Sequence, residues 1–331
     1  MRILRKLTAA MMAGLLLGAG CFESQPGGIS DAWTLRVTAA AGDVIMDGDL
    51  RYILEEDNTL SVLRYTGTSA KIVIPETVQG YPVTQIGKCA FEENEVMTEV
   101  VLPETIVVVD YKAFSRCKNL ETINFPKSLK RIEEYAFTTC HSLKAIDLSN
   151  VSYIGVCAFQ LCISLTEITV SGNIRQIPDH AFHGCHSLEK LIFEEGVEKI
   201  DPEAALNHYF LREIYIPASV TTIGEHALGF EYYYPDYMRI DVKIYGYRGT
   251  EAERYAKDNG FEFVSLDPVE CPDINADGKA TIADAVQLTK IIGESVAPPS
   301  GFDSTAADLD EDGLLTLSDV SKLMKLLEKL N

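Results

Sequence analysis

Apolar residues return along the middle of the chain with a period close to 23 residues. Each return contains the dipeptide Ala-Phe, and successive phenylalanines lie 23, 23, 22 and 23 residues apart, at Phe91, Phe114, Phe137, Phe159 and Phe182. Around each dipeptide, a short alternating stretch, an apolar pair and a small turn with cysteine recur in the same order. One such unit has no second layer to cover its apolar face, so the pattern predicts units stacked into a solenoid with one continuous core.

Both ends of this array carry patterns that predict caps. Residues 43–65 alternate between apolar and polar around Asp-Gly and Asp-Asn turns, which predicts a β-hairpin. After the last unit, residues 244–246 predict a strand and residues 250–258 predict a short helix. Thr250 and Glu253 have the spacing of a capping box at the start of that helix.

A second duplicated pattern occupies residues 273–331. Each copy is a 12-residue loop with oxygen-bearing side chains at positions 1, 3, 5, 9 and 12 and glycine at position 6, followed by apolar residues at helical spacing. The oxygen-bearing residues are Asp273, Asn275, Asp277, Thr281 and Asp284 in the first loop, and Asp308, Asp310, Asp312, Thr316 and Asp319 in the second. Calcium loops collect hard oxygen ligands at this spacing, so the pattern predicts two calcium ions bound by a small all-α unit.

The repeat array resembles the BspA-like leucine-rich repeats found in bacterial and protist surface proteins. The resemblance covers residues 72–264 and lies in the period and in the elements I-x-I-P, A-F and C-x-x-L. It implies an α/β-type leucine-rich-repeat solenoid with a parallel sheet on one face and the β-hairpin as its N-terminal cap. Solenoids use such faces to bind partners, here an unknown protein or glycan.

Two columns of alternating strand positions are expected to form that exposed face. They consist of Glu99 and Val101, Thr122 and Asn124, Ala145 and Asp147, Glu167 and Thr169, Lys190 and Ile192, and Glu213 and Tyr215.

The C-terminal unit resembles a type I dockerin, the calcium-folded module that attaches a protein to a cohesin of a cellulosome scaffold. The resemblance lies in the duplicated loop and helix and in the aspartate at position 12 of each loop. It implies that position 7, Lys279 and Leu314, belongs to each calcium site. It also implies cohesin contacts at Ile282, Ala283, Lys290, Leu317, Ser318 and Lys325. A plain EF-hand pair or an acidic tail is the alternative, and the cohesin type and a single or dual binding mode stay open.

The N-terminus has the features of a secretion signal. Basic residues precede an apolar run over residues 7–20 that is too short to span a bilayer. The expected organisation is a signal peptide over 1–20, a disordered leader over 21–42, the capped solenoid over 43–264, a linker over 265–272 and the dockerin-like domain over 273–331. Cys21 follows a stretch similar to a lipobox, so a lipid-anchored form is the alternative to ordinary secretion.

Charge and motifs narrow the function classes. The formal net charge is −20 and no basic stripe is present, which argues against nucleic acids and anionic membranes as partners. The sequence contains no Ser-His-Asp set, nucleophile elbow or phosphate loop. We therefore expect a secreted, non-catalytic binding or adhesion protein associated with a cellulosome and its polysaccharide degradation. A polysaccharide-active enzyme or a protease inhibitor on the solenoid is the alternative.

Four cysteines share one position in successive units: Cys117, Cys140, Cys162 and Cys185. Stacked identical positions point their Cβ atoms the same way, which predicts free buried thiols rather than disulfides.

A histidine group and a tyrosine group also stand out. His180, His183, Cys185 and His186 invite a zinc site, but other units hold varied residues there, so we interpret them as variable surface-turn positions. A patch that could contact proteins or sugars is formed by Tyr232, Tyr233, Tyr234 and Tyr237.

Overall fold

The computed structural model describes residues 39–267, 274, 281–293, 304–309 and 314–330. The chain divides into two compact units, residues 1–266 and 267–331. The expected signal peptide, Cys21 and most of the leader and linker lie outside the described residues. Within the described ranges, no helix is long and apolar enough to cross a membrane.

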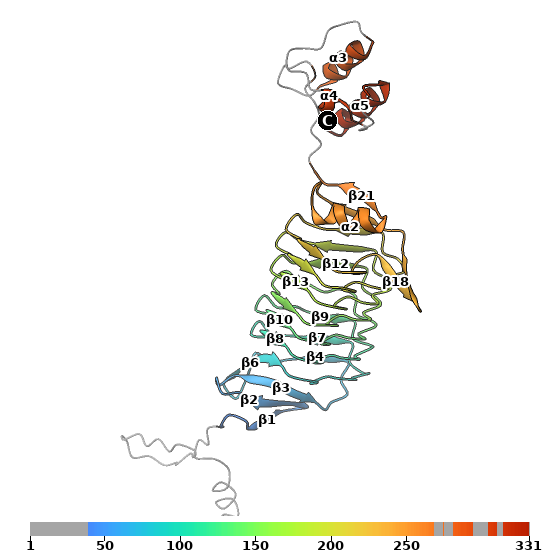
Figure 1. Ribbon diagram of the computed structural model, residues 1–331. Helices are drawn as coiled ribbons and strands as arrows, with labels where there is room; N and C mark the ends of the chain where they lie inside the picture. The colour runs from blue at the N-terminus through green and yellow to red at the C-terminus, as the bar shows by residue number, and fades with distance from the viewer. Residues whose placement is uncertain (1–38, 268–273, 275–280, 294–303, 310–313, 331) are drawn as a thin grey trace, which may run out of the picture. The chain divides into compact units, whose positions relative to one another are not determined.

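An antiparallel meander of β1 (Val44–Asp47), β2 (Leu50–Leu54) and β3 (Leu60–Tyr65) closes the N-terminal end of the solenoid. The predicted hairpin is thus confirmed, with one further strand. The meander buries apolar side chains of β2 and β3 in the core that it shares with the turns. β3 pairs in parallel with β6 (Tyr81–Ile86), which joins the cap to the first turn (Figure 1). The short β5 (Thr77–Val78) pairs antiparallel with β6.

The turns of the solenoid carry strands at two positions, which form two sets of parallel strands (Figure 1). The first set follows the alternating stretch of each unit: β4 (Lys71–Val73), β7 (Glu99–Val101), β9 (Thr122–Ile123), β12 (Glu167–Val170), β14 (Lys190–Phe193), β16 (Glu213–Tyr215), β20 (Lys243–Gly246) and β21 (Glu262–Ser265). The second set follows the apolar pair: β6, β8 (Val108–Val109), β10 (Arg131–Ile132), β11 (Tyr153–Ile154), β13 (Gln176–Ile177), β15 (Lys199–Ile200) and β17 (Thr222–Ile223). The sequence predicted a sheet on one face only, because strands of two residues are too short to show alternation.

The first set of strands is interrupted between β9 and β12. The unit in between is one residue shorter than its neighbours, in the stretch from Ile146 to Val151. Asp147 makes a local turn there, because its carboxylate accepts a hydrogen bond from the backbone N–H of Ser149 at 2.9 Å. The expectation of continuous columns is therefore wrong in this unit: Ala145 and Asp147 are exposed but belong to no strand.

A ladder of five phenylalanine rings runs through the core, one ring in each turn. All five Ala-Phe phenylalanines are buried, and neighbouring ring centroids are 5.1, 5.1, 5.3 and 5.9 Å apart. The planes of neighbouring rings differ by 12° or less. Stacked rings stabilise the core beyond the apolar area that they bury. The ladder stops after Phe182, because the next unit has Ala205 at this position.

The backbone just before each ring adopts a conformation that is costly for residues with a Cβ atom. Every residue that precedes an Ala-Phe dipeptide has a left-handed φ between +54° and +59°: Cys89, Lys112, Tyr135, Cys157 and His180. A hydrogen-bond ladder compensates, since each phenylalanine N–H donates to the alanine carbonyl of the next turn at 2.8 to 2.9 Å. Each turn is therefore held in shape by its neighbour.

The cysteine column lies beside the ring ladder, and all four of its side chains are fully buried. Each thiol donates to the carbonyl of the phenylalanine in the preceding turn, at 3.0 to 3.3 Å. Burial raises the pKa of the Cys140 thiol well above its ordinary value, which keeps the proton for this hydrogen bond. The prediction of free buried thiols is confirmed, since all four are free.

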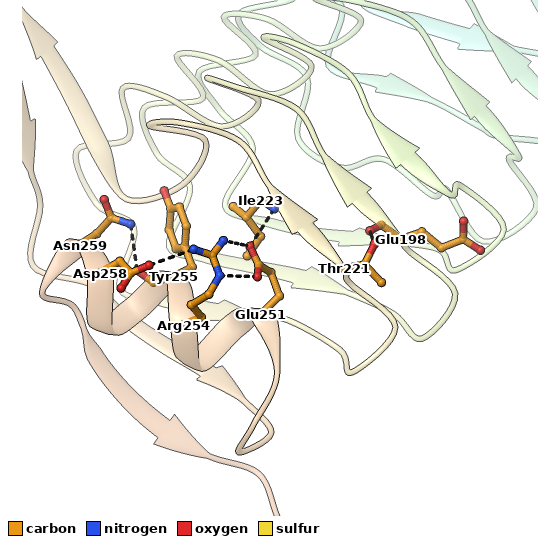
Figure 2. A network of polar contacts seen from close by, with 8 residues as sticks. All are labelled: Glu198, Thr221, Ile223, Glu251, Arg254, Tyr255, Asp258 and Asn259. Carbon is orange, nitrogen blue, oxygen red and sulfur yellow. Dashed lines mark hydrogen bonds and ion pairs between the residues drawn. The ribbon is translucent and has the colours of Figure 1, made fainter.

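Helix α2 (Glu251–Asn259) and β21 close the C-terminal end of the solenoid. The phenol of Tyr255 donates to the carbonyl of Leu228 at 2.8 Å and accepts from its N–H at 3.1 Å. This phenol therefore satisfies both backbone hydrogen-bonding groups of Leu228 in the last turn. On the same helix, Arg254 pairs with Glu251 and Asp258 (Figure 2).

The start of α2 differs from the expected capping box. The hydroxyl of Thr250 makes no bond into the helix and donates instead to the carbonyl of Tyr247 at 2.6 Å. Glu253 reaches back one residue further than expected and accepts from the N–H of Gly249 at 2.6 Å. At its C-terminal end the helix stops at Gly260, which has the left-handed conformation at φ +71°.

The C-terminal unit is a small helical body with its own core. It contains α3 (Ile282–Ile292), α4 (Ser304–Ala307) and α5 (Leu317–Leu330), and α3 packs against α5. Its buried apolar residues are Ile274, Ala285, Leu288, Ala307 and Leu323. Both helices begin where the loop pattern predicts them.

We expect Cys140→Ala to lower the free energy of unfolding by about 1–2 kcal/mol, because the substitution removes a buried thiol and its hydrogen bond. Cys89→Ala is the matched control, since Cys89 is exposed. Urea denaturation of both variants measures the effect. Alkylation followed by mass spectrometry should label Cys89 in the native protein and Cys140 only after unfolding. Native labelling of Cys140, or a disulfide to Cys117, would contradict this assignment.

Candidate functional site

The two calcium-loop patterns end in the same hydrogen-bond arrangement. The backbone N–H of Thr281 donates to Asp284 Oδ2 at 2.6 Å, and the N–H of Thr316 donates to Asp319 Oδ2 at 2.7 Å. In each half the threonine hydroxyl lies 3.4 Å from the same carboxylate oxygen. The sequence duplication is therefore also a duplication in space.

The same threonines begin the two helices. Thr281 Oγ1 accepts from the N–H of Ala283 at 3.2 Å, and Thr316 Oγ1 accepts from the N–H of Ser318 at 3.1 Å. Together with the aspartate that bonds back to the threonine N–H, this forms a capping box with aspartate in place of glutamate. Position 12 of each loop thus serves the helix as well as the loop.

Asp284 and Asp319 are fully buried, which is costly for a carboxylate without compensation. Hydrogen bonds from backbone N–H groups compensate part of this cost. Asp319 accepts a further one from the N–H of Leu309 at 2.8 Å. The predicted ligands at positions 1, 3, 5, 9 and 12 of each loop offer side-chain oxygen atoms, and such a donor set fits calcium.

The described part of the chain contains half of the predicted calcium residues: Thr281, Asp284, Asp308, Leu314, Thr316 and Asp319. The others lie outside the described residues: Asp273, Asn275, Asp277, Lys279, Asp310 and Asp312. Within the described residues, no group of three or more His, Cys, Asp or Glu side chains is arranged to hold a metal ion. Leu314, at position 7 of the second loop, is 64% exposed.

All six residues predicted to contact a cohesin are exposed: Ile282, Ala283, Lys290, Leu317, Ser318 and Lys325. Ile282 and Leu317 are the first residues of α3 and α5, and they are 60% and 65% exposed. Val286 is exposed one turn after Ile282 and extends the apolar surface of α3. Sequence reasoning missed Val286, although its i+4 spacing from Ile282 was a usable signal.

On the solenoid, the first set of strands presents its alternate side chains outward as predicted. In β14, Lys190 and Ile192 are partly exposed, whereas Leu191 and Phe193 are buried. The outer charges form a register of opposite signs across five strands: Glu167, Lys190, Glu213, Lys243 and Glu262. Lys243 pairs with Glu262 at 2.8 Å. Because the charges face one another, this face offers little net charge to a ligand.

The neighbouring outer column is apolar and aromatic at its C-terminal end. Tyr215 and Tyr245 stack with ring centroids 4.4 Å apart. Lys190 Nζ lies 4.9 Å from the Tyr215 ring centroid, and the Tyr215 phenol donates to Glu213 at 3.1 Å. Tyr215 was predicted to be exposed here, whereas Tyr245 was assigned only to the closing strand.

The tyrosine-rich segment forms a hairpin of β18 (Phe230–Tyr233) and β19 (Asp236–Arg239). The sequence predicted a patch of four tyrosines here. Three of them are exposed, Tyr232, Tyr233 and Tyr234, while Tyr237 is partly buried. Proline and aspartate after three tyrosines were the turn signal that would have indicated a hairpin.

The histidine group lies in one turn of the solenoid, but its members have separate roles. His180 Nδ1 lies 2.7 Å from Asp179 and its Nε2 lies 3.0 Å from Glu203. The His180 and His183 rings stack at 4.8 Å. Cys185 points into the core, where its thiol donates to the carbonyl of Phe159.

Sequence reasoning missed His208, which takes the cysteine-column position in the unit where Ala205 replaces phenylalanine. It is 1% exposed, and its Nδ1 lies 2.8 Å from the carbonyl oxygen of Cys185. Burial lowers the pKa of His208 to about 4 and, together with the nearby His180, lowers the pKa of His183 to about 4. Both imidazoles are therefore neutral in the folded protein near pH 7.

Comparison with protein families finds a match to the BspA type leucine rich repeat region, in six copies over residues 63–156 and 148–232. These ranges together span about half of the 331 residues, and they end before the C-terminal unit. A comparison with curated proteins finds no match.

Among solved structures, the chain is similar to a leucine rich cell surface protein from Faecalibacterium prausnitzii A2-165. The identity is 28% and the TM-score 0.50, over 61% of this chain and 62% of that protein. The chain thus covers less than two thirds of that relative. A leucine rich repeat protein from T. pallidum matches at 23% identity and TM-score 0.47, over 55% and 86% of the two chains. A leucine-rich repeat protein from Bacteroides ovatus ATCC 8483 matches at 24% identity and TM-score 0.46, over 62% of each chain.

We expect the protein to lose stability as the pH falls below about 6.5, because the unfolded chain then binds protons that His183 and His208 exclude when folded. The contribution of each histidine is complete above its unfolded pKa and is lost as the pH falls toward its folded pKa of about 4. Each can change the folding equilibrium by up to tenfold per pH unit.

Urea denaturation between about pH 7 and pH 5 measures this dependence. The variant His208→Cys restores the residue of the column and should flatten the pH dependence relative to the parent protein. An identical slope in both proteins would show that His208 is not responsible.

Proposed function

Because the chain belongs to the BspA-type leucine-rich repeat family, we propose that it is an exported, non-catalytic binding protein with two attachment surfaces. The solenoid recognises a protein or glycan, and the C-terminal unit is a dockerin that attaches the chain to a cohesin of a cellulosome scaffold. The similarity to a protein named for the cell surface supports export. The signal-like N-terminus supports it too, with lipid anchoring through Cys21 as the alternative to release.

The observation that carries the docking assignment is the duplicated geometry at the ends of the two loops. Equivalent hydrogen bonds in the two halves have lengths that agree within 0.1 Å. The threonine N–H to aspartate bonds are 2.6 and 2.7 Å long, and the bonds accepted by the threonine hydroxyls at the helix starts are 3.2 and 3.1 Å long. An acidic tail has no reason to fold twice into the same arrangement. A unit with two equivalent loop–helix halves has two equivalent surfaces.

Calcium would be held by the oxygen atoms of loop positions 1, 3, 5, 7, 9 and 12 in each half. The ion supplies positive charge beside Asp284 and Asp319, which the fold buries completely. The protein's own N–H groups orient these carboxylates and leave the loop to complete the ligand set. Because the acidic loops repel themselves without the ion, calcium binding contributes directly to folding of the unit.

The cohesin contact is proposed for the surface around the first residues of α3 and α5. Ile282 and Leu317 expose apolar side chains there, and Lys290 and Lys325 occupy matching exposed places further along the helices. An exposed apolar residue ringed by polar ones is typical of a binding surface. The two halves present similar surfaces, so we infer that either can bind one cohesin.

We expect calcium to protect α3 and α5 from hydrogen exchange in the full-length protein, compared with the same protein in a chelator. The amides of these helices should be protected because calcium binding folds the C-terminal unit. The solenoid peptides are an internal control and should exchange equally in both conditions. Asp284→Ala with Asp319→Ala should remove the calcium effect. Equal protection of residues 281–330 with and without calcium would refute the calcium assignment.

We expect Ile282→Asp or Leu317→Asp alone to weaken cohesin binding by about tenfold or less, because the second surface remains available. The double substitution should abolish binding, since each aspartate would be buried without a partner in the interface. Calorimetry against a panel of cohesins measures this, with Val107→Asp on the solenoid as the control. Complete loss from one single variant with calcium protection intact would show one fixed orientation.

A further inference from the structure

The solenoid gathers exposed aromatic and apolar side chains at one place near its C-terminal end. Five residues contribute, from the turn before the hairpin and from the hairpin itself: Tyr209, Phe210, Tyr233, Tyr234 and Met238. We call this group the tyrosine patch. Tyr232 lies on the other face of the hairpin, where its ring contacts that of Tyr237. Tyr234 is 89% exposed and stands at the tip of the hairpin, between β18 and β19.

The hairpin is anchored by residues outside the patch. Phe230 is buried, and its ring meets that of Phe261 edge-on at 5.4 Å. The Tyr237 phenol donates to Glu203, and its ring stacks on His226 at 3.7 Å. Backbone bonds at the base of the hairpin complete the attachment. The exposed tyrosines are therefore presented on a fixed support, which reduces the entropy lost on binding.

The patch is continuous across two turns of the solenoid. The N–H of Asn207 donates to the carbonyl of Phe230 at 2.9 Å, and Asn207 Oδ1 accepts from the N–H of Tyr232 at 2.7 Å. These bonds hold β18 beside the turn that carries Tyr209 and Phe210. A hydrogen bond to Glu231, aided by the nearby phenol of Tyr209, raises the pKa of Tyr233. The phenols of both segments thus share one surface.

The charge around the patch excludes several classes of partner. The hairpin itself carries two carboxylates, Glu231 and Asp236, and Glu231 is hydrogen-bonded to Tyr233. The only basic residue in the sequence of the hairpin, Arg239, donates to the carbonyl of Gly260 and lies against the Phe261 ring. Phosphates, uronates and nucleic acids would therefore be repelled. A second copy of a chain with net charge −20 is disfavoured for the same reason.

The carboxylates also do not form a free acidic surface for a basic protein. Glu231 is hydrogen-bonded to Tyr233, and Glu203 at the base of the hairpin accepts from Tyr237 and faces His180. They act as hydrogen-bond acceptors beside aromatic rings. Phenol rings supply apolar faces with polar tips.

We propose that the tyrosine patch binds a neutral polysaccharide. Its rings pack against the C–H faces of sugar residues, and its phenols and carboxylates bond to sugar hydroxyls. The proposal rests on the proposed function, because it names the ligand class for the solenoid's recognition surface.

Affinity electrophoresis of the full-length protein tests this, in native gels that contain hydroxyethyl cellulose, xyloglucan, galactomannan or starch. At least one of these four should retard the protein, while polygalacturonate should not. Tyr233→Ser with Tyr234→Ser should weaken the retardation at least about tenfold. Val44→Ser with Met46→Ser is the matched control, because it removes two exposed apolar side chains from the hairpin at the other end of the solenoid.

The proposal is overturned if none of the four neutral polymers retards the protein. It is equally overturned if the tyrosine variant is retarded as strongly as the parent, or if only polygalacturonate or a polylysine peptide binds. Melting temperatures of both double variants should match the parent, since all four side chains are exposed. Calcium-dependent protection of the C-terminal unit, measured on the same preparation, separates failure of this proposal from failure of the docking assignment.

Discussion

The solenoid depends on contacts between turns, because no single turn can cover its own apolar face. The phenylalanine rings of the ladder stack on rings of neighbouring turns, and the N–H of each is bonded to the carbonyl of the following turn. The left-handed residue before each ring is tolerated for the same reason. Stability therefore grows with the number of stacked turns, as in other repeat proteins.

This constraint explains why both ends differ from the middle. The last rings and carbonyls need partners that no further turn supplies. At the N-terminal end, the meander β1–β3 continues the second set of strands. At the other end, α2 places the Tyr255 phenol where a further turn would bond Leu228. The unit with Ala205 in place of phenylalanine and His208 in place of cysteine marks where the regular core stops, just before the tyrosine-rich hairpin.

The same constraint also decides which positions can serve binding. Buried positions repeat because they face one another, while outer positions are free to vary. The outer charges of β12, β14, β16, β20 and β21 alternate in sign, so that face carries little net charge. The exposed aromatic residues lie instead in the last turns, where the hairpin β18–β19 interrupts the repeat. In the C-terminal unit, buried Asp284 and Asp319 are structural, and the exposed Ile282 and Leu317 beside them are available to a partner.

The sequence by itself determined the repeat, its caps, the buried thiols and the position of the two C-terminal helices, because each follows from local periodicity. Only the tertiary structure decided the second set of strands, since two residues such as Arg131 and Ile132 carry no alternation. It alone showed the break at Asp147 and the hairpin at Tyr232, where the chain departs from its period. It also revealed the burial of His208 and placed Tyr209 beside Tyr233. These features depend on contacts with the neighbouring turn, and a short stretch of sequence does not contain the residues that make those contacts.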